Sequence, residues 1–139
     1  MTDRLFVYGT LRSESSHPLA RRLQMQAKFL GKASAEGSLY DLGRYPGALF
    51  HANATERITG EVYALRNPAR LFATLDTYEA IEEGASAFKR LIITVRLDKG
   101  GVLKAWSYGL SGIPRLARPI ESGDFILHAR AKTRRPLRR

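Results

Sequence analysis

The sequence predicts one compact domain in which helices accompany a curved, mainly antiparallel sheet. Short extended segments alternate with turn residues over positions 37–65, and two further strand-like segments, 89–97 and 102–108, are joined by a glycine turn. A run of short strands with tight connections favours antiparallel over parallel pairing. A chain of 139 residues is long enough for one hydrophobic core and too short for two independent domains.

The N-terminal part of the chain predicts a strand followed by a helix. The apolar, partly β-branched run at 5–7 ends before a turn with a glycine, as a buried central strand does. Ser15 or Ser16 can cap a helix that carries Pro18 in its first turn. We expect this helix to end before Gly31.

The remaining strands are expected in hairpins or a meander. Extended segments are predicted at 39–42 and 48–51, and a clearer strand at 58–65. Apolar and polar residues alternate over 89–97, which is a strong strand pattern. A Lys-Gly-Gly turn then leads into the hairpin partner at 102–108.

The clearest helix spans residues 67–79. Asn67 is a good N-cap, and Pro68 stands at the first helical position, where its missing N–H costs nothing. At about 100° per residue, one apolar stripe comprises Leu71, Phe72, Leu75 and Tyr78. Glu79 falls inside that stripe, so the pattern points a carboxylate toward the core, where an apolar setting makes it a better proton acceptor.

The composition excludes several kinds of site. The chain has no cysteine, so it has no disulfide framework, no thiolate metal site and no cysteine nucleophile. His17, His51 and His128 lack metal-ligand spacing, and we treat all three as non-catalytic. Since no apolar run approaches the roughly 20 residues of a membrane span or forms a signal peptide, we expect a cytoplasmic protein without membrane association.

A basic segment ends the chain. Six basic residues between 130 and 139 account for +6 of the net charge of +10, which leaves +4 for the rest. Such a tail can bind nucleic acid by counterion release. Because no Phe, Tyr or Trp lies within it to stack on bases, a solvated terminus is favoured. We therefore divide the chain into a folded domain, 1–127, and a flexible basic tail, 128–139.

A series of short landmarks covers residues 6–125. The first is Val7-Tyr8-Gly9-Thr10-Leu11-Arg12. Those that follow are Leu39-Tyr40-Asp41, Tyr45-Pro46-Gly47, Gly60-Glu61-Val62-Tyr63, Leu75-Asp76-Thr77-Tyr78-Glu79, Phe88-Lys89-Arg90 and Ala105-Trp106-Ser107-Tyr108. With these fragments in this order, the chain resembles the gamma-glutamylcyclotransferase-like proteins, including their AIG2-like and gamma-glutamylamine cyclotransferase branches.

The resemblance implies an α+β fold around a small, mainly antiparallel β-barrel, and an intramolecular acyl transfer. In that reaction the α-amine of a γ-glutamyl compound attacks its own γ-carbonyl carbon, closes 5-oxoproline and releases an amine or amino acid. Because both reacting groups belong to one molecule, the protein mainly folds the substrate and manages protons. The reaction requires no metal or cofactor.

The resemblance also implies roles for particular residues. Glu79 would accept the proton of the substrate ammonium and help to protonate the leaving nitrogen. The residues expected to bind the substrate in the turn after the first strand are Tyr8, Gly9, Thr10 and Leu11. Their backbone amides suit the α-carboxylate of the substrate or the oxyanion of the tetrahedral intermediate. Tyr108 is expected to supply a hydroxyl that orients the substrate or Glu79.

Alternatives remain open for the site and for the whole chain. Glu79 could instead form a structural ion pair with Arg90 or Arg44, and the Tyr-Gly pair could be only a tight turn. The segment Glu83-Gly84 offers a second alignment of the family glutamate, although the preceding Leu-Asp pair favours Glu79. The chain as a whole could be a non-catalytic module that binds a small metabolite, or a nucleic-acid-associated protein acting through its tail. The sequence leaves the leaving group and the oligomeric state open.

Overall fold

Seven strands and three helices make up the part of the chain that the structure describes. The computed structural model describes residues 3–9, 11–15, 17–43, 46–82, 88–112 and 117–134, and only the backbone of 78–82 and 132–134. The elements in order are β1 (Arg4–Val7), α1 (Pro18–Gln26), β2 (Ala27–Asp41), β3 (Pro46–Phe50), β4 (Arg57–Leu65), α2 (Pro68–Glu82), β5 (Phe88–Leu97), β6 (Val102–Leu110), β7 (Arg118–Pro119) and α3 (Phe125–Arg134).

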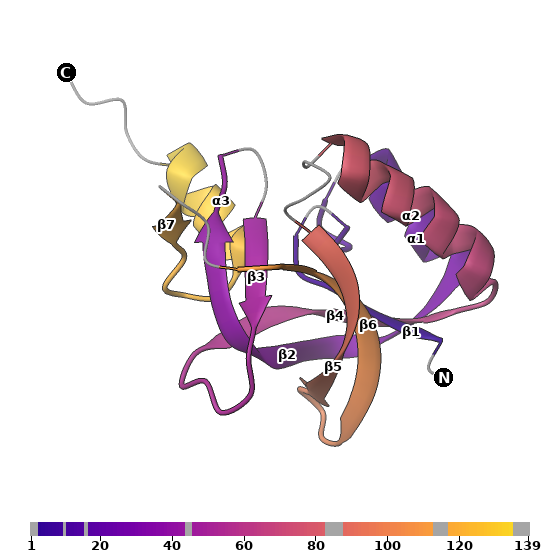
Figure 1. The fold of residues 1–139 in the computed structure, drawn as a ribbon, viewed down its shortest axis with the longest axis horizontal. Helices are drawn as coiled ribbons and strands as arrows, with labels where there is room; N and C mark the ends of the chain where they lie inside the picture. The colour runs from indigo at the N-terminus through magenta and orange to yellow at the C-terminus, as the bar shows by residue number, and fades with distance from the viewer. Residues whose placement is uncertain are drawn as a thin grey trace.

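Five of these strands form a mixed β-barrel, which confirms the expected fold class. Their order is β2-β4-β1-β6-β5, and pairing between β5 and β2 closes the ring. β1 lies between β4 and β6, antiparallel to the first and parallel to the second, so the expected central strand is also confirmed. Helices α1 and α2 flank one side of the barrel, and α3 lies with β7 and β3 at the other end (Figure 1).

The strand β2 is longer than the sequence predicts. The first extended segment of this region was expected at 39–42, whereas β2 begins at Ala27, directly after α1. The buried positions of its middle part are Ala33 and Ala35, whose small side chains give little of the apolar alternation that marks a strand. Gly31 and Gly37 have φ of 148° and 153°, a region that favours glycine, and they interrupt the pattern further.

Helix α1 is capped by a residue other than the predicted one. Ser15 and Ser16 were the expected caps, but the N-cap is His17, whose Nδ1 accepts the N–H of Leu19 at 3.1 Å. The hydroxyl of Ser15 accepts the N–H of His17 at 3.0 Å, so it bonds to the cap residue itself. Pro18 in the first turn of this helix is confirmed.

Helix α2 begins as predicted. The side chain of Asn67 accepts the N–H of Arg70 at 3.3 Å, and Pro68 is the first helical residue. The stripe residues Leu71, Phe72 and Leu75 are buried. The side chains of Tyr78 and Glu79, which complete the predicted stripe, lie outside the described part of the structure.

Two clusters of buried side chains lie on opposite faces of β1. Leu5 and Val7 contribute to the cluster beneath the helices, together with Leu23 of α1 and Leu75 of α2. Phe6 contributes to the cluster inside the barrel, whose other members include Tyr8, Ile58, Val62, Ile93 and Val95. Because neighbouring strand residues point to opposite faces, β1 separates a helix-side core from a barrel core.

The C-terminal elements cross the expected boundary of the basic tail. Residues 128–134, which the sequence analysis places in the tail, have a helical backbone in α3. Residues 135–139 lie outside the described part of the structure. Among the described helices, none is long and apolar enough to cross a membrane.

Gly60 permits the close contact between β4 and β1, and replacing it should destabilise the barrel. A Cβ at Gly60 would lie 2.3 Å from the carbonyl oxygen of Val7 and 2.7 Å from the ring of Phe6. We expect Gly60→Ala to lower the free energy of unfolding by about 2–3 kcal/mol, as overpacking does. Urea denaturation measures this change. Gly112→Ala is the matched control, since no heavy atom lies within 4 Å of its added Cβ, and equal stability loss in both variants would contradict the prediction.

Candidate active site

The side chain of Tyr8, the first residue after β1, lies inside the barrel. Its hydroxyl donates to the carbonyl of Tyr108 in β6 at 2.6 Å and accepts the N–H of Ala48 in β3 at 3.2 Å. The ring of Phe50 packs against it edge-on, with centroids 5.9 Å apart. The phenol of Tyr8 therefore joins three strands and fixes the point at which the chain leaves the barrel.

The segment after Tyr8 forms two consecutive turns. The N–H of Arg12 donates to the carbonyl of Gly9 at 3.1 Å, and the N–H of Ser15 donates to the carbonyl of Arg12 at 2.9 Å. We call Gly9 and residues 11–13 the β1 turn. A tight turn of this kind brings successive backbone amides close together, which is the arrangement that suits an anion.

Packing on both sides holds the β1 turn in place. A Cβ on Gly9 would lie 2.7 Å from Cγ of Pro46, so only glycine fits without displacing that ring. The side chain of Leu11 is buried in the helix-side core. Of the predicted substrate-binding residues, Thr10 lies outside the described part of the structure.

Beneath the β1 turn lies a buried carboxylate, Glu61 of β4. Glu61 has 0% exposure and stands beside Val7 in the strand register. Its Oε1 accepts the N–H of Ser13 at 2.7 Å and the hydroxyl of Tyr63 at 3.1 Å, while its Oε2 accepts the hydroxyl of Ser13 at 2.6 Å. Burial and the adjacent charge of Glu61 raise the pKa of Tyr63 well above its ordinary value, so this phenol stays protonated and donates.

Arg12 attaches the β1 turn to the C-terminal part of the chain. Its side chain is 3% exposed, and Nη1 donates to Oδ1 of Asp124 at 2.8 Å, with Glu14 at 3.4 Å from Nη2. Asp124 is held in turn because the N–H of Thr59 in β4 donates to the carbonyl of Gly123 at 2.7 Å. The turn is thus fastened to the barrel core, the helix-side core and the segment before α3.

A second cluster of polar groups lies between α2 and the β5–β6 hairpin. The carboxylate of Asp76 in α2 accepts the hydroxyl of Tyr108 at 2.5 Å and pairs with Arg90, whose Nε lies 3.2 Å from Oδ1. The guanidinium of Arg90 lies 4.2 Å from the ring centroid of Phe72 and 4.8 Å from that of Trp106. Two rings and one carboxylate therefore hold this cation in place.

Tyr108 connects the two clusters. Its hydroxyl contacts Asp76 of α2, and its carbonyl accepts the hydroxyl of Tyr8. Glu79 follows Asp76 by three residues, less than one helical turn along α2. The structure thus brings together Tyr8, Tyr108 and the helical segment that contains Glu79, while the side chain of Glu79 is outside the described residues.

The ion-pair alternative for Glu79 named Arg90 and Arg44. Among the side chains that the structure describes, the carboxylate partner of Arg90 is Asp76. Arg44 lies outside the described residues. The side chain of Glu79 is itself outside the described residues, so the ion-pair alternative stays a prediction.

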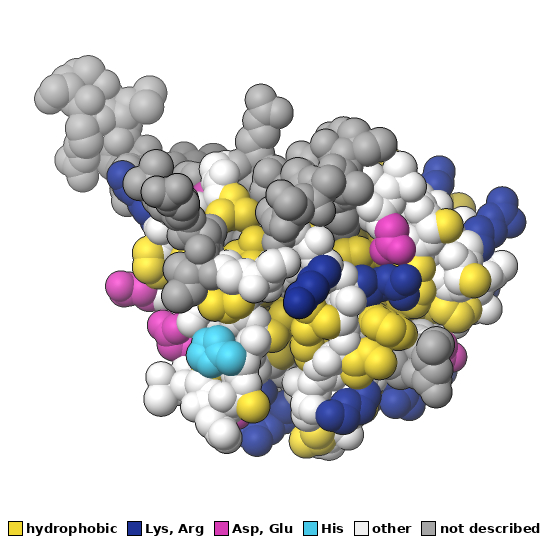
Figure 2. Space-filling view, in the orientation of Figure 1, with side chains coloured by type: hydrophobic (Ala, Val, Ile, Leu, Met, Phe, Trp, Pro, Cys, Tyr) yellow, Lys and Arg dark blue, Asp and Glu magenta, His cyan; other side chains and the backbone are white. Residues whose placement is uncertain are grey.

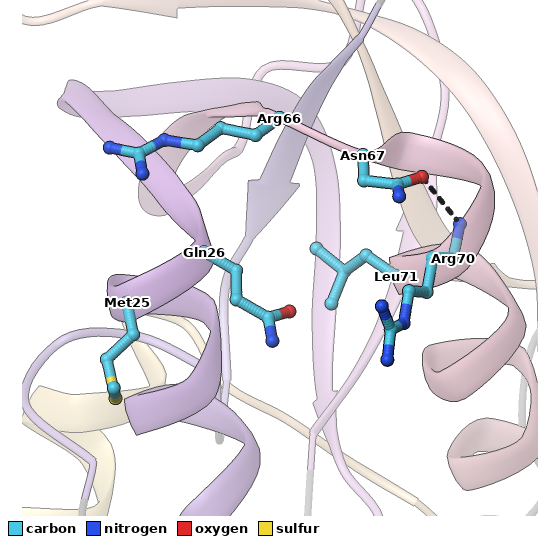
Figure 3. Close-up of a pocket in the computed structure, with 6 residues that line it drawn as sticks. All are labelled: Met25, Gln26, Arg66, Asn67, Arg70 and Leu71. Carbon is cyan, nitrogen blue, oxygen red and sulfur yellow. Dashed lines mark hydrogen bonds between the residues drawn. The ribbon is translucent and has the colours of Figure 1, made fainter.

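A pocket of about 220 Å³ lies at the other end of α2. It lies between the end of α1 and the start of α2, lined by Met25, Gln26, Arg66, Asn67, Arg70 and Leu71. Figure 3 shows Gln26 and Arg70 pointing toward each other across it. This pocket lies beside the start of β1, where the N–H of Leu65 donates to the carbonyl of Asp3, whereas the β1 turn follows the end of that strand.

Basic side chains do not gather at one place on the face of the molecule shown in Figure 2. The Lys and Arg side chains of the described residues are spread over that face among apolar and neutral groups. The folded part of the chain that is visible there therefore presents no continuous basic stripe of the kind that follows a nucleic-acid backbone.

Comparison with known proteins decides the family. Residues 5–127 match the family described as gamma-glutamyl cyclotransferase, AIG2-like. The chain belongs to this family. The resemblance drawn from the sequence landmarks is thereby confirmed, and the matched segment runs from β1 into α3, so it includes the barrel strands and helices α1 and α2.

Individual relatives agree with this assignment. A protein of Vibrio cholerae named "Putative gamma-glutamylcyclotransferase" is 32% identical over 126 residues, which cover 90% of this chain and 96% of the relative. The crystal structure of YkqA from Bacillus subtilis superposes with a TM-score of 0.71 at 27% identity, covering 99% of this chain and 45% of YkqA. An AIG2-like protein of Mus musculus shares the fold, with a TM-score of 0.64, 20% identity and 81% and 80% of the two chains covered.

Sequence reasoning did not assign roles to Glu61, Asp76 and Asp124. Glu61 was noted only as part of a landmark, although it alternates with Tyr63 and Leu65 along one face of an apolar strand. A carboxylate on such a face is a signal of a buried polar contact. The contacts of Asp76 with Arg90 and Tyr108, and that of Asp124 with Arg12, join residues 14–112 positions apart, so no local pattern could have revealed them.

The Asp124 contact should make stability depend on pH. Burial acts to raise the pKa of Asp124, but hydrogen bonds from the Leu127 backbone and from Arg12 outweigh it and lower the pKa below its ordinary value of 3.8. A lowered pKa means that the ionised group stabilises the fold above pH 3.8 and that this contribution is lost as the pH falls through the folded value. We expect Asp124→Asn to cost about 1 kcal/mol at pH 7, since the pair is partly screened by solvent.

Urea denaturation of both proteins at pH 7 and pH 3 measures this effect. The difference between wild type and Asp124→Asn should shrink at pH 3, because below pH 3.8 the carboxyl of the unfolded wild-type chain takes up a proton, which favours unfolding. A difference that is the same at both pH values would show that the charge of Asp124 contributes nothing.

Proposed function

We propose that the protein is a cyclotransferase that converts γ-glutamyl amines or γ-glutamyl peptides into 5-oxoproline and a released amine or amino acid. The observation that supports this best is the position of Tyr108, which contacts Asp76 of α2 and Tyr8 at the end of β1. These contacts hold the α2 segment that contains Glu79 near the β1 turn. Family membership supports the γ-glutamyl class of substrate.

The proposed reaction begins with a proton transfer to Glu79. The α-ammonium of the substrate gives its proton to this carboxylate, and the free amine attacks the γ-carbonyl carbon to form a five-membered ring. The leaving nitrogen takes the proton from Glu79 as its bond to that carbon breaks. The ring nitrogen, which carries two hydrogens after the attack, then gives its second proton to Glu79, which passes it to the released amine. Folding the substrate so that its two ends meet supplies much of the rate enhancement.

The β1 turn is proposed to bind the anionic part of the substrate through its backbone. The phenol of Tyr8 and the side chain of Leu11 are buried in the two cores, so these two residues can offer a ligand only their main chain. The amides of the turn other than those of Arg12 and Ser13, whose N–H groups donate to Gly9 and Glu61, would bind the α-carboxylate of the substrate or the oxyanion of the tetrahedral intermediate. The side of Gly9 on which a Cβ would stand is filled by the ring of Pro46, so glycine at this position lets the turn pack against β3.

Glu79→Gln should remove the proton carrier while keeping the shape of the side chain. We expect the rate of lactam formation to fall by about 10²–10⁴-fold, the usual contribution of a general base. The measurement is 5-oxoproline release from a panel of γ-glutamyl amines and γ-glutamyl amino acids. Absence of lactam from every substrate with the wild-type protein would contradict the proposed function.

Glu83→Gln is the matched control for this experiment. Glu83 belongs to the competing alignment of the family glutamate and has no assigned role. The control should retain wild-type turnover. If Glu83→Gln abolishes lactam formation while Glu79→Gln does not, the proton carrier is four residues further along the chain.

Tyr108→Phe should impair catalysis by removing the hydroxyl that donates to Asp76. A hydrogen bond to a charged group contributes about 1.5–3 kcal/mol, so we expect kcat/KM to fall about tenfold or more. Thermal denaturation of the variant checks that the fold persists at the assay temperature. Wild-type kcat/KM in folded Tyr108→Phe would restrict this residue to a structural role through its carbonyl.

A further inference from the structure

Glu61 is a fully buried carboxylate that the proposed reaction does not use. Three hydrogen-bond donors converge on it, two of them from Ser13 at the end of the β1 turn and one from Tyr63 in its own strand. A buried carboxylate is costly unless donors compensate for the water it loses, so such a group is retained where its contacts serve a purpose.

Because of the position of Glu61 in β4, its hydrogen bonds hold the β1 turn. In the sheet it stands beside Val7, the last residue of β1, from which the chain leaves toward the β1 turn. Ser13 returns over β4, so that the carboxylate binds the far end of the turn. The near end is already fixed, because Tyr8 is bonded to β6 and β3. The turn is thereby fastened at both ends to the barrel.

Ser13 itself is exposed, and neither of the two cores holds it. Its backbone N–H and its hydroxyl both donate to the carboxylate of Glu61, at 2.7 and 2.6 Å. These are short distances, as expected for bonds in which one partner is charged. Without that partner, the contacts of the described residues that hold the turn would be its backbone hydrogen bonds, the Arg12 contacts and the packing of Leu11.

We propose that Glu61 is a positioning residue that holds the backbone amides of the β1 turn in the conformation that binds the anionic part of the substrate. The inference rests on the proposed function for the identity of the ligand. Glu61 acts through Ser13 and does not itself touch the substrate. Its role is pre-organisation, since amides fixed before binding lose no freedom when the anion arrives.

Glu61→Met tests the inference, because methionine has nearly the length of glutamate but no strong acceptor. We expect kcat/KM for a γ-glutamyl substrate to fall at least tenfold, and the affinity for 5-oxoproline, which carries the same carboxylate, to fall with it. Glu61→Gln keeps an oxygen for the Ser13 N–H and should restore kcat/KM to within about threefold of wild type. Equal loss in the Met and Gln variants would overturn the proposal.

Two further variants separate positioning from a general loss of stability. Ser13→Ala removes only the hydroxyl contact at an exposed residue, so it should fold, and it should lower kcat/KM by about threefold. The matched control is Ser38→Ala, which removes a serine-to-glutamate hydrogen bond of 2.7 Å to Glu56, away from the turn. The control should keep wild-type kinetics. If both serine variants lose activity equally, the Glu61 contact has no special role.

One measurement does not depend on turnover. In an NMR spectrum of the labelled protein, the amide proton of Ser13 should move upfield and exchange faster in Glu61→Met than in wild type, while the Gln variant keeps the wild-type position. An unchanged Ser13 amide would refute the positioning role whatever the kinetics show. A shifted amide in a protein that forms no lactam from any substrate would leave Glu61 holding the turn and would reject the cyclotransferase proposal alone.

Discussion

The barrel closes because one strand, β2, forms hydrogen bonds along both of its edges. It pairs with β4 over residues 27–36 and with β5 over 33–35, and its last part pairs with β3 and β7. A strand that serves so many partners has to bend, and Gly31 and Gly37 adopt the backbone conformations that allow the bends. The position of every other strand, β1 included, follows from this closure.

The site region depends on the chain at the end of β1, whose side chains pack into both cores. Tyr8 points into the barrel, where its hydroxyl is bonded to two strands, and Leu11 packs into the helix-side core. Glu61 then accepts the N–H of Ser13 at the end of the turn. A short segment is thus held by apolar packing, neutral hydrogen bonds and a charged hydrogen bond at once, which is how a protein keeps backbone amides aimed at a ligand.

The elements that are marked by neighbouring residues could be predicted from the sequence. The features that depend on contacts between residues far apart in the chain could not. Asn67 and Pro68 identified the start of α2, and alternation over 89–97 identified β5. The first half of β2 was missed because alanines and glycines replace large apolar residues there. For the site, the motif located Tyr8 and Tyr108, whereas the partners Asp76 and Asp124 are brought near only by the complete fold. The cap of α1 was misplaced because a histidine nitrogen took the role usual for a serine oxygen.

Side chains fill the barrel core, so proteins of this architecture can diversify outside it. Phe6, Tyr8, Ile58 and Val62 occupy the interior together with residues of β5, so the barrel is a solid support and not a container. Segments that leave its rim can change in length and chemistry while the packed interior stays the same. A new substrate specificity can therefore evolve in these segments without a change in the stability of the packed interior.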